Sequence, residues 1–148
     1  MNAQEETRAL TRELKLQFRI LGGLVAIMWG AEILDQLVFG GRLDIFGIIP
    51  RSLIGLRGIA FAPFLHGSFA HLIGNTIPFL VLGWLIMVRQ TSDFIWVTLV
   101  VALASGLGTW LFGAPGIHIG ASGVVFGYLG YLLLRGFFER HLGSISLS

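Results

Sequence analysis

The fold of this protein is decided by one long apolar stretch, FIWVTLVVALASGLGTWLFGAPGIHIGASGVVFGYLGYLLL, which runs from Phe94 to Leu134. The stretch contains no Asp, Glu, Lys or Arg, and its one basic side chain is His118. Gly113-Ala114-Pro115-Gly116 interrupts it near the middle, as a tight turn does. A helix needs about 20 mostly apolar residues to cross a bilayer. The stretch therefore predicts two membrane helices, at about 94–112 and 120–138.

The composition of the whole chain also indicates a membrane protein. Of its 148 residues, 55% are hydrophobic and 12% are charged, and this charged fraction is about half of what a soluble domain carries. Two further apolar segments, 20–39 and 71–88, are long enough to span. We therefore expect an all-α, polytopic transmembrane helix bundle with four spans. The chain has no cysteine, which excludes disulfides and a thiol nucleophile. It also has no basic patch interleaved with aromatics, so nucleic-acid binding is not expected.

Residues 1–19 predict an amphipathic helix on the membrane surface. Leu10, Leu14 and Phe18 recur every fourth position among charged residues, which is the spacing of one helical face. The acidic start, with Glu5 and Glu6, is not typical of a cleavable signal peptide. We expect this segment to remain and to be cytoplasmic.

The basic residues predict the orientation of the spans. With the N-terminus inside, most of them face the cytoplasm, as the positive-inside rule requires. The inner set is Arg8, Arg12, Lys15, Arg19, Arg89, Arg135 and Arg140, and the outer set is Arg42, Arg51 and Arg57. The prediction is a multi-pass protein of the cell membrane with a cytoplasmic N-terminus. Residues 40–70 alternate charged and apolar side chains, which suits a first loop of short helices embedded at the outer leaflet.

Three polar side chains are predicted to lie at the same depth below the outer face. His71 and Asn75 are one turn apart at the start of the second span, and Ser122 stands in the first turn of the fourth, within Gly120-Ala121-Ser122-Gly123. Unpaired N–H groups at a helix start can stabilise the oxyanion that forms when a hydroxyl attacks a carbonyl. The alternative is plain packing, because Gly and Ser often line helix contacts in membranes. In this alternative, His71 and Asn75 form ordinary interhelical hydrogen bonds.

The order His66, His71, Asn75 and then Gly120-Ala121-Ser122-Gly123 resembles the rhomboid family of intramembrane serine proteases, over roughly residues 57–136. This resemblance implies that Ser122 is the nucleophile that cleaves transmembrane protein substrates near the outer face. It implies that His71 and Asn75 stabilise the oxyanion, and that His66 is a structural residue of the loop. Phe126 matches a position where the family often has an aromatic beside the catalytic imidazole. No metal and no organic cofactor are implied.

The chain departs from the family in one respect, which is the base. Rhomboids use a Ser-His dyad whose histidine lies on a sixth span, and the sequence is expected to be truncated before that span. His141 follows Ser122 by nineteen residues, or roughly 28 Å along a helix, and His118 has nothing to fix its orientation. His71 can serve as a base on geometry alone, although the resemblance assigns it to the oxyanion site. The alternative function is a catalytically inactive rhomboid-like protein that binds transmembrane helices.

Glu32 and Asp35, near the end of the first predicted span, suggest a different class of function. Intramembrane carboxylates are candidates for proton transport. A proton-coupled transporter needs further ionisable groups along one path, however, and the inner halves of the second to fourth spans have none. We therefore expect these two carboxylates to lie at the interface or to face protein.

Overall fold

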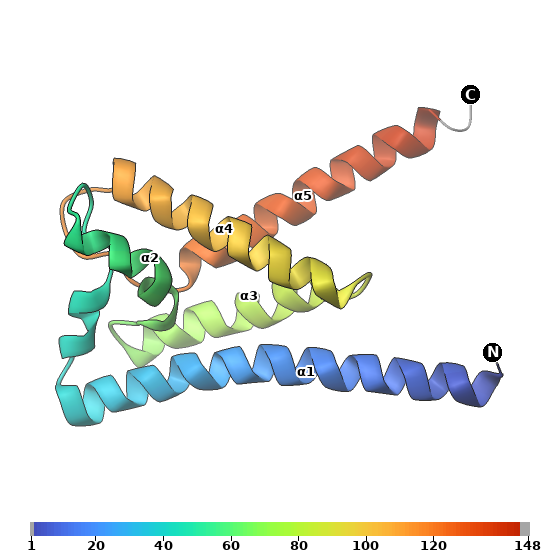
Figure 1. Cartoon of the computed structure of the whole chain (residues 1–148), viewed down its shortest axis with the longest axis horizontal. Coiled ribbons are helices and arrows are strands. Elements are labelled where there is room, and N and C mark those ends of the chain that lie inside the picture. Colours follow the sequence, from blue (N-terminus) through green and yellow to red (C-terminus); the bar gives the residue numbers. More distant parts are fainter. Residues whose placement is uncertain (1, 146–148) are drawn as a thin grey trace.

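The computed structural model describes residues 2–145, with side chains for residues 2–139. This part of the chain is all-α, as predicted (Figure 1). Its α-helices are α1 (Ala3–Leu34), α2 (Gly58–Phe61), α3 (Phe69–Met87), α4 (Thr91–Phe112) and α5 (Ser122–Ile145).

Three helical segments in this part of the chain are long and apolar enough to cross a membrane. They are Ala3–Phe39, which contains α1, and the helices α3 and α4. The protein is thus a multi-pass membrane protein by the length and composition of its helices. Residues 122–138 of the predicted fourth span lie in α5, and the described part of α5 is less apolar than these three segments. Its glycines, its tyrosines and the charged residues Arg135 and Glu139 lower its hydropathy, so membrane crossing by α5 stays a prediction.

Helix α1 joins the predicted surface helix and the first predicted span without a break. It begins with a capping box, in which the Asn2 side chain accepts from Glu5 N–H and the Glu5 carboxylate accepts from Asn2 N–H. It continues through a π-helical turn, Asp35–Phe39, and ends at Gly40, whose left-handed backbone turns the chain. Glu32 and Asp35 are buried, so they face protein, which is one of the two predicted outcomes.

The first loop, residues 40–70, folds into short helices as predicted. It contains the 3₁₀ turns Arg42–Phe46, Ile54–Arg57 and Ala62–Phe64, with α2 between the last two. Arg51 joins this loop to the end of α4 by three hydrogen bonds. Its backbone N–H donates to Trp110 O, and its guanidinium donates to Leu111 O and Gly113 O. The carbonyls at a helix C-terminus lack intrahelical donors. The first loop therefore caps α4.

The core lies where α3, α4 and α5 meet, around the aromatic rings of Phe79, Phe94 and Tyr128. Their centroids are 5.7 to 6.4 Å apart, and Tyr128 is fully buried. Helix α5 approaches α4 through glycine, since a Cβ at Gly127 would lie 2.0 Å from Val101 Cγ1. Small residues permit this close packing of membrane helices. Close packing of this kind is found at Gly127, whereas Gly130 has open space around it.

We predict that Gly127→Ala destabilises the protein, whereas Gly130→Ala does not. Overpacking a tight contact costs about 1–3 kcal/mol. Removing a glycine from an open helical position gains up to about 1 kcal/mol. Thermal unfolding in detergent measures both variants, and equal midpoints would contradict the close α4–α5 approach.

Candidate functional site

The start of α3 holds His71 and Asn75 on one face of the helix. Ser68 is the N-cap, and its hydroxyl accepts from the N–H of His71 at 3.2 Å. The Asn75 amide nitrogen donates to His71 O at 3.0 Å. Asn75 is 6% exposed. One of the two N–H bonds of this amide thus remains available for another acceptor.

The segment that precedes Ser122 is held by the first loop through backbone hydrogen bonds. Ile48 and His118 exchange two N–H to O bonds, each 2.9 Å long. The N–H of Gly120 bonds to Ala62 O at 2.8 Å. The N–H of Ala121 donates to His66 Nε2 at 3.4 Å. His66, predicted as a structural loop residue, is therefore a buried support for the residue before the serine.

Gly120 brings this segment against His71 and Asn75. A Cβ at Gly120 would lie 2.7 Å from both Cε1 and Nε2 of His71, and 3.8 Å from Asn75 Nδ2. The backbone φ of +109° at Gly120 is also one that side-chain-bearing residues rarely adopt. Both facts require glycine here. The structure thus brings together Gly120, His71 and Asn75, two residues before Ser122.

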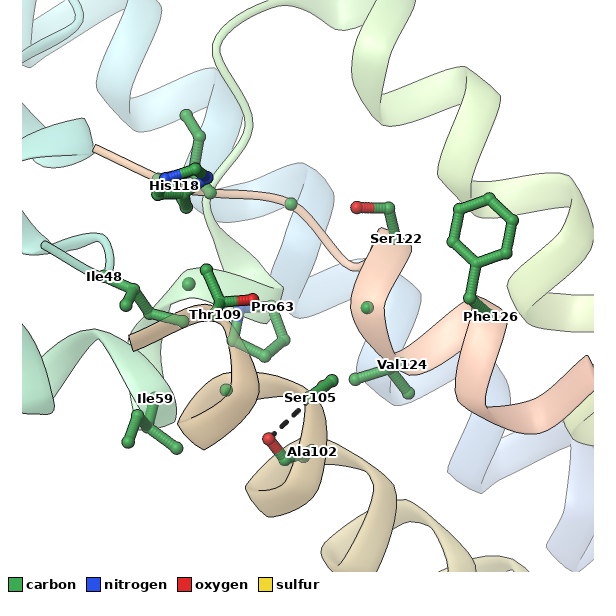
Figure 2. Close-up of a pocket in the computed structure, with 15 residues that line it drawn as sticks. Ile48, Ile59, Pro63, Ala102, Ser105, Thr109, His118, Ser122, Val124 and Phe126 are labelled. Carbon is green, nitrogen blue, oxygen red and sulfur yellow. Dashed lines mark hydrogen bonds between the residues drawn. The ribbon is translucent and has the colours of Figure 1, made fainter. Parts of the chain in front are cut away.

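Ser122 is the first residue of α5 and lines a cavity of about 210 Å³ between α4, α5 and the first loop (Figure 2). Its hydroxyl points away from the Phe126 ring. It makes no hydrogen bond to any other side chain among residues 2–139. The first N–H groups of a helix have no intrahelical partner, so α5 offers donors beside this hydroxyl. The site therefore combines a hydroxyl, N–H donors and an open cavity.

No hydrogen bond joins a described histidine side chain to the Ser122 hydroxyl. The Nε2 of His118 bonds to Ala114 O at 2.8 Å. A carbonyl oxygen only accepts, so this nitrogen carries the proton. The His66 ring packs on His71 with centroids 5.0 Å apart. His141 lies on α5, and its side chain is outside the described residues.

One feature of the site, a pair of hydroxyls on α4, was not predicted from the sequence. Ser105 and Thr109 of α4 line the same cavity as Ser122, but a lone hydroxyl in an apolar span gives no signal of a site. Phe126 also lines the cavity and is 71% exposed, and no described imidazole packs on it.

Among the described side chains, no group of three or more His, Asp or Glu is arranged to hold a metal ion.

Comparison with known proteins shows the family of this chain. Residues 55–147 match the rhomboid domain. This chain belongs to the rhomboid family. It is 48% identical over 122 residues to uncharacterized proteins of Mycobacterium tuberculosis and Mycobacterium bovis, covering 78% of this chain and 50% of theirs. An uncharacterized protein of Mycobacterium leprae is 45% identical over 122 residues, covering 78% of this chain and 48% of its own. This rhomboid chain thus spans about half the length of the curated relatives that it matches.

Lowering the pH should destabilise the folded protein through His66, whose ring supports the site. Burial, aided by the nearby His71, lowers the pKa of His66 from 6.5 to about 4. Between these values the unfolded chain binds a proton that the folded chain does not, so stability falls as the pH drops from about 6.5 to 4. The full loss is about 3 kcal/mol. Below the folded pKa the penalty no longer grows.

The measurement is the thermal midpoint between pH 7 and pH 4, for the wild type and for His66→Gln. Glutamine does not titrate, and its side-chain oxygen can still accept from the N–H of Ala121. Burial, with the charges of Asp35 and Glu32, raises the pKa of Asp44. A raised carboxyl pKa makes the folded protein more stable as the pH falls, which opposes the effect of His66. Because both proteins contain Asp44, this contribution is the same in both profiles. We expect a flatter profile for the variant, and identical profiles would contradict this role of His66.

Proposed function

We propose that this rhomboid chain carries the nucleophile and the oxyanion-binding residues of an intramembrane serine endopeptidase. Its substrates would be transmembrane proteins, cut near the outer face of the cell membrane, with the N-terminus of the chain in the cytoplasm. The observation that supports the proposal is the contact of Gly120 with His71 and Asn75. His71 and Asn75 thus lie beside the segment that leads into α5 and Ser122, and the proposal assigns both as donors to the oxyanion.

In the proposed reaction, Ser122 Oγ attacks the scissile carbonyl carbon. A C–O bond forms, the hydroxyl proton passes to a base, and the carbonyl oxygen becomes an oxyanion. The N–H groups of the first turn of α5, together with His71 and Asn75, donate to this oxygen. Donors already fixed in place stabilise developing charge most effectively. The cavity beside Ser122 leaves room for a substrate residue and for the water that completes hydrolysis.

In this proposal, the base that accepts the serine proton is not one of the described histidines. In the family resemblance, the dyad histidine lies on a sixth span, and no described histidine side chain is hydrogen-bonded to the Ser122 hydroxyl. Transfer of the serine proton to a positioned imidazole is the usual activation of such a nucleophile. The chain by itself should therefore react poorly with serine-directed probes.

The second candidate function is a catalytically inactive rhomboid-like protein that binds transmembrane helices. It is favoured by one observation: the hydroxyl of Ser122 has no hydrogen bond to a basic side chain among the described residues. Both functions use the same helices. They differ in whether Ser122 becomes acylated.

A chimera with a rhomboid relative separates the two functions. The chain is joined to the part of the Mycobacterium tuberculosis relative that follows the matched region, and is treated with a fluorophosphonate. We expect labelling of the chimera, loss of labelling in Ser122→Ala, and little labelling of the chain alone. Ser105→Ala is the matched control, because Ser105 lines the same cavity from α4.

The chimera's thermal midpoint shows whether it is folded. A folded chimera without labelling would contradict the peptidase and support the inactive binder. Equal labelling of the chimera and its Ser122→Ala variant would end the claim that this serine is the nucleophile.

Asn75→Ala in the same chimera should slow turnover of a transmembrane substrate. Loss of one oxyanion donor typically lowers kcat about 10²–10³-fold. Because this donor acts in the transition state, KM should change little. The ratio of kcat between variant and parent is the measurement. A rise in KM with unchanged kcat would assign Asn75 to substrate binding instead.

A further inference from the structure

An apolar groove lies between α1 and α4. These helices pack against α3 from opposite sides (Figure 1). Two adjoining cavities, of about 620 and 410 Å³, occupy the space between them and share Leu24, Thr98 and Leu99. We call this space the α1–α4 groove. It adjoins the cavity at Ser122, with which its larger cavity shares Ile59, Pro63, Ala102 and Val124.

The groove has the length of one leaflet of a bilayer. Its wall on α1 runs from Met28 to Ile20, which is about 12 Å of helix. Half of the hydrocarbon core of a bilayer is about 15 Å deep. A lipid chain lying along the helices would fill the groove from the first loop toward the middle of the membrane.

The lining of the groove suits hydrocarbon rather than water. Apart from Arg57, its lining side chains in the larger cavity are apolar except for Thr98. The Thr98 hydroxyl is already hydrogen-bonded to Phe94 O and to the Tyr128 hydroxyl. Apart from Arg57, the lining of the larger cavity therefore offers no free polar group. A buried water needs two or more polar partners, so this lining suits hydrocarbon better than water.

Arg57 stands at the end of the groove next to the first loop. Its Nη2 donates to Ile45 O at 3.0 Å, and its guanidinium lies 4.7 Å from the centre of the Phe46 ring. Its Nε is buried without a hydrogen-bond partner. Among the described side chains, no carboxylate lies within 4.0 Å of Arg57. A fixed cation without a carboxylate partner among the described side chains thus borders an apolar groove.

We propose that the α1–α4 groove binds one acyl chain of an anionic phospholipid, whose phosphate is held by Arg57. The groove supplies a surface for the hydrocarbon chain, and the guanidinium supplies the charge that an anionic headgroup complements. The bound lipid would brace the first loop against α1 and α4. Because the first loop carries Ile48, Ala62 and His66, the lipid would support the segment that precedes Ser122. The proposal holds whether or not Ser122 is catalytic.

Native mass spectrometry of the full chain tests the proposal. The protein in neutral detergent is exposed to equal amounts of phosphatidylglycerol and phosphatidylcholine. We expect one retained phospholipid, mainly phosphatidylglycerol. One basic side chain near an anionic surface is worth about a fivefold preference, so Arg57→Gln should remove a preference of this size and Arg57→Lys should largely keep it.

Two glycines of α1 provide a matched pair that does not depend on Arg57. Gly23 lines the groove and Gly22 does not, and a Cβ added at either position would meet no atom within 4 Å. Gly23→Phe should fill the groove and lower lipid retention, whereas Gly22→Phe should leave retention unchanged. The thermal midpoint of each variant confirms that it is folded.

Three results would overturn the proposal. The first is equal retention by folded Gly23→Phe and Gly22→Phe. The second is equal retention of phosphatidylglycerol and phosphatidylcholine by the wild type. The third is a dimer that carries no lipid and dissociates in Gly23→Phe, because a second copy would then occupy the groove. Each result is read from lipid retention or oligomeric state, and none uses labelling of Ser122.

Discussion

The position of Ser122 depends on the backbone hydrogen bonds between the first loop and the non-helical residues 113–121. An unpaired N–H or C=O group in a lipid environment costs several kcal/mol, and this segment has no helix of its own to satisfy these groups. Ile48 pairs with both backbone groups of His118, Ala62 accepts from Gly120, and His66 accepts from Ala121. The first loop is therefore part of the site, although it contributes no proposed nucleophile.

Glycine decides how closely the helices around this site approach. At Gly127 the missing side chain lets α5 lie against Val101 of α4, and at Gly120 it lets the backbone reach His71. The first contact sets how closely α5 lies against α4. The second sets the distance between the serine segment and the donors of α3. Each is a steric condition that a single methyl group would break.

The two hollow regions of the molecule differ in what they can hold. The cavity at Ser122 includes the hydroxyls of Ser105 and Thr109 and the helix start of α5, which suits a polar reaction. The α1–α4 groove has an apolar floor and one cation at its end. The first loop borders both, through Ile59 and Pro63. A lipid in the groove and a substrate at Ser122 would thus contact the same short segment.

The sequence by itself determined the helices and the order of the motif. Apolar length predicted 71–88 and 94–112, found as Phe69–Met87 and Thr91–Phe112, because the hydrophobic requirement of a span is local in sequence. Spacing also predicted that His71, Asn75 and the serine segment lie at one end of the bundle. Only the tertiary structure decided that His66 supports Ala121, 55 residues away, and that Ser105 shares a cavity with Ser122. Such contacts join distant residues through packing, and no local pattern encodes them.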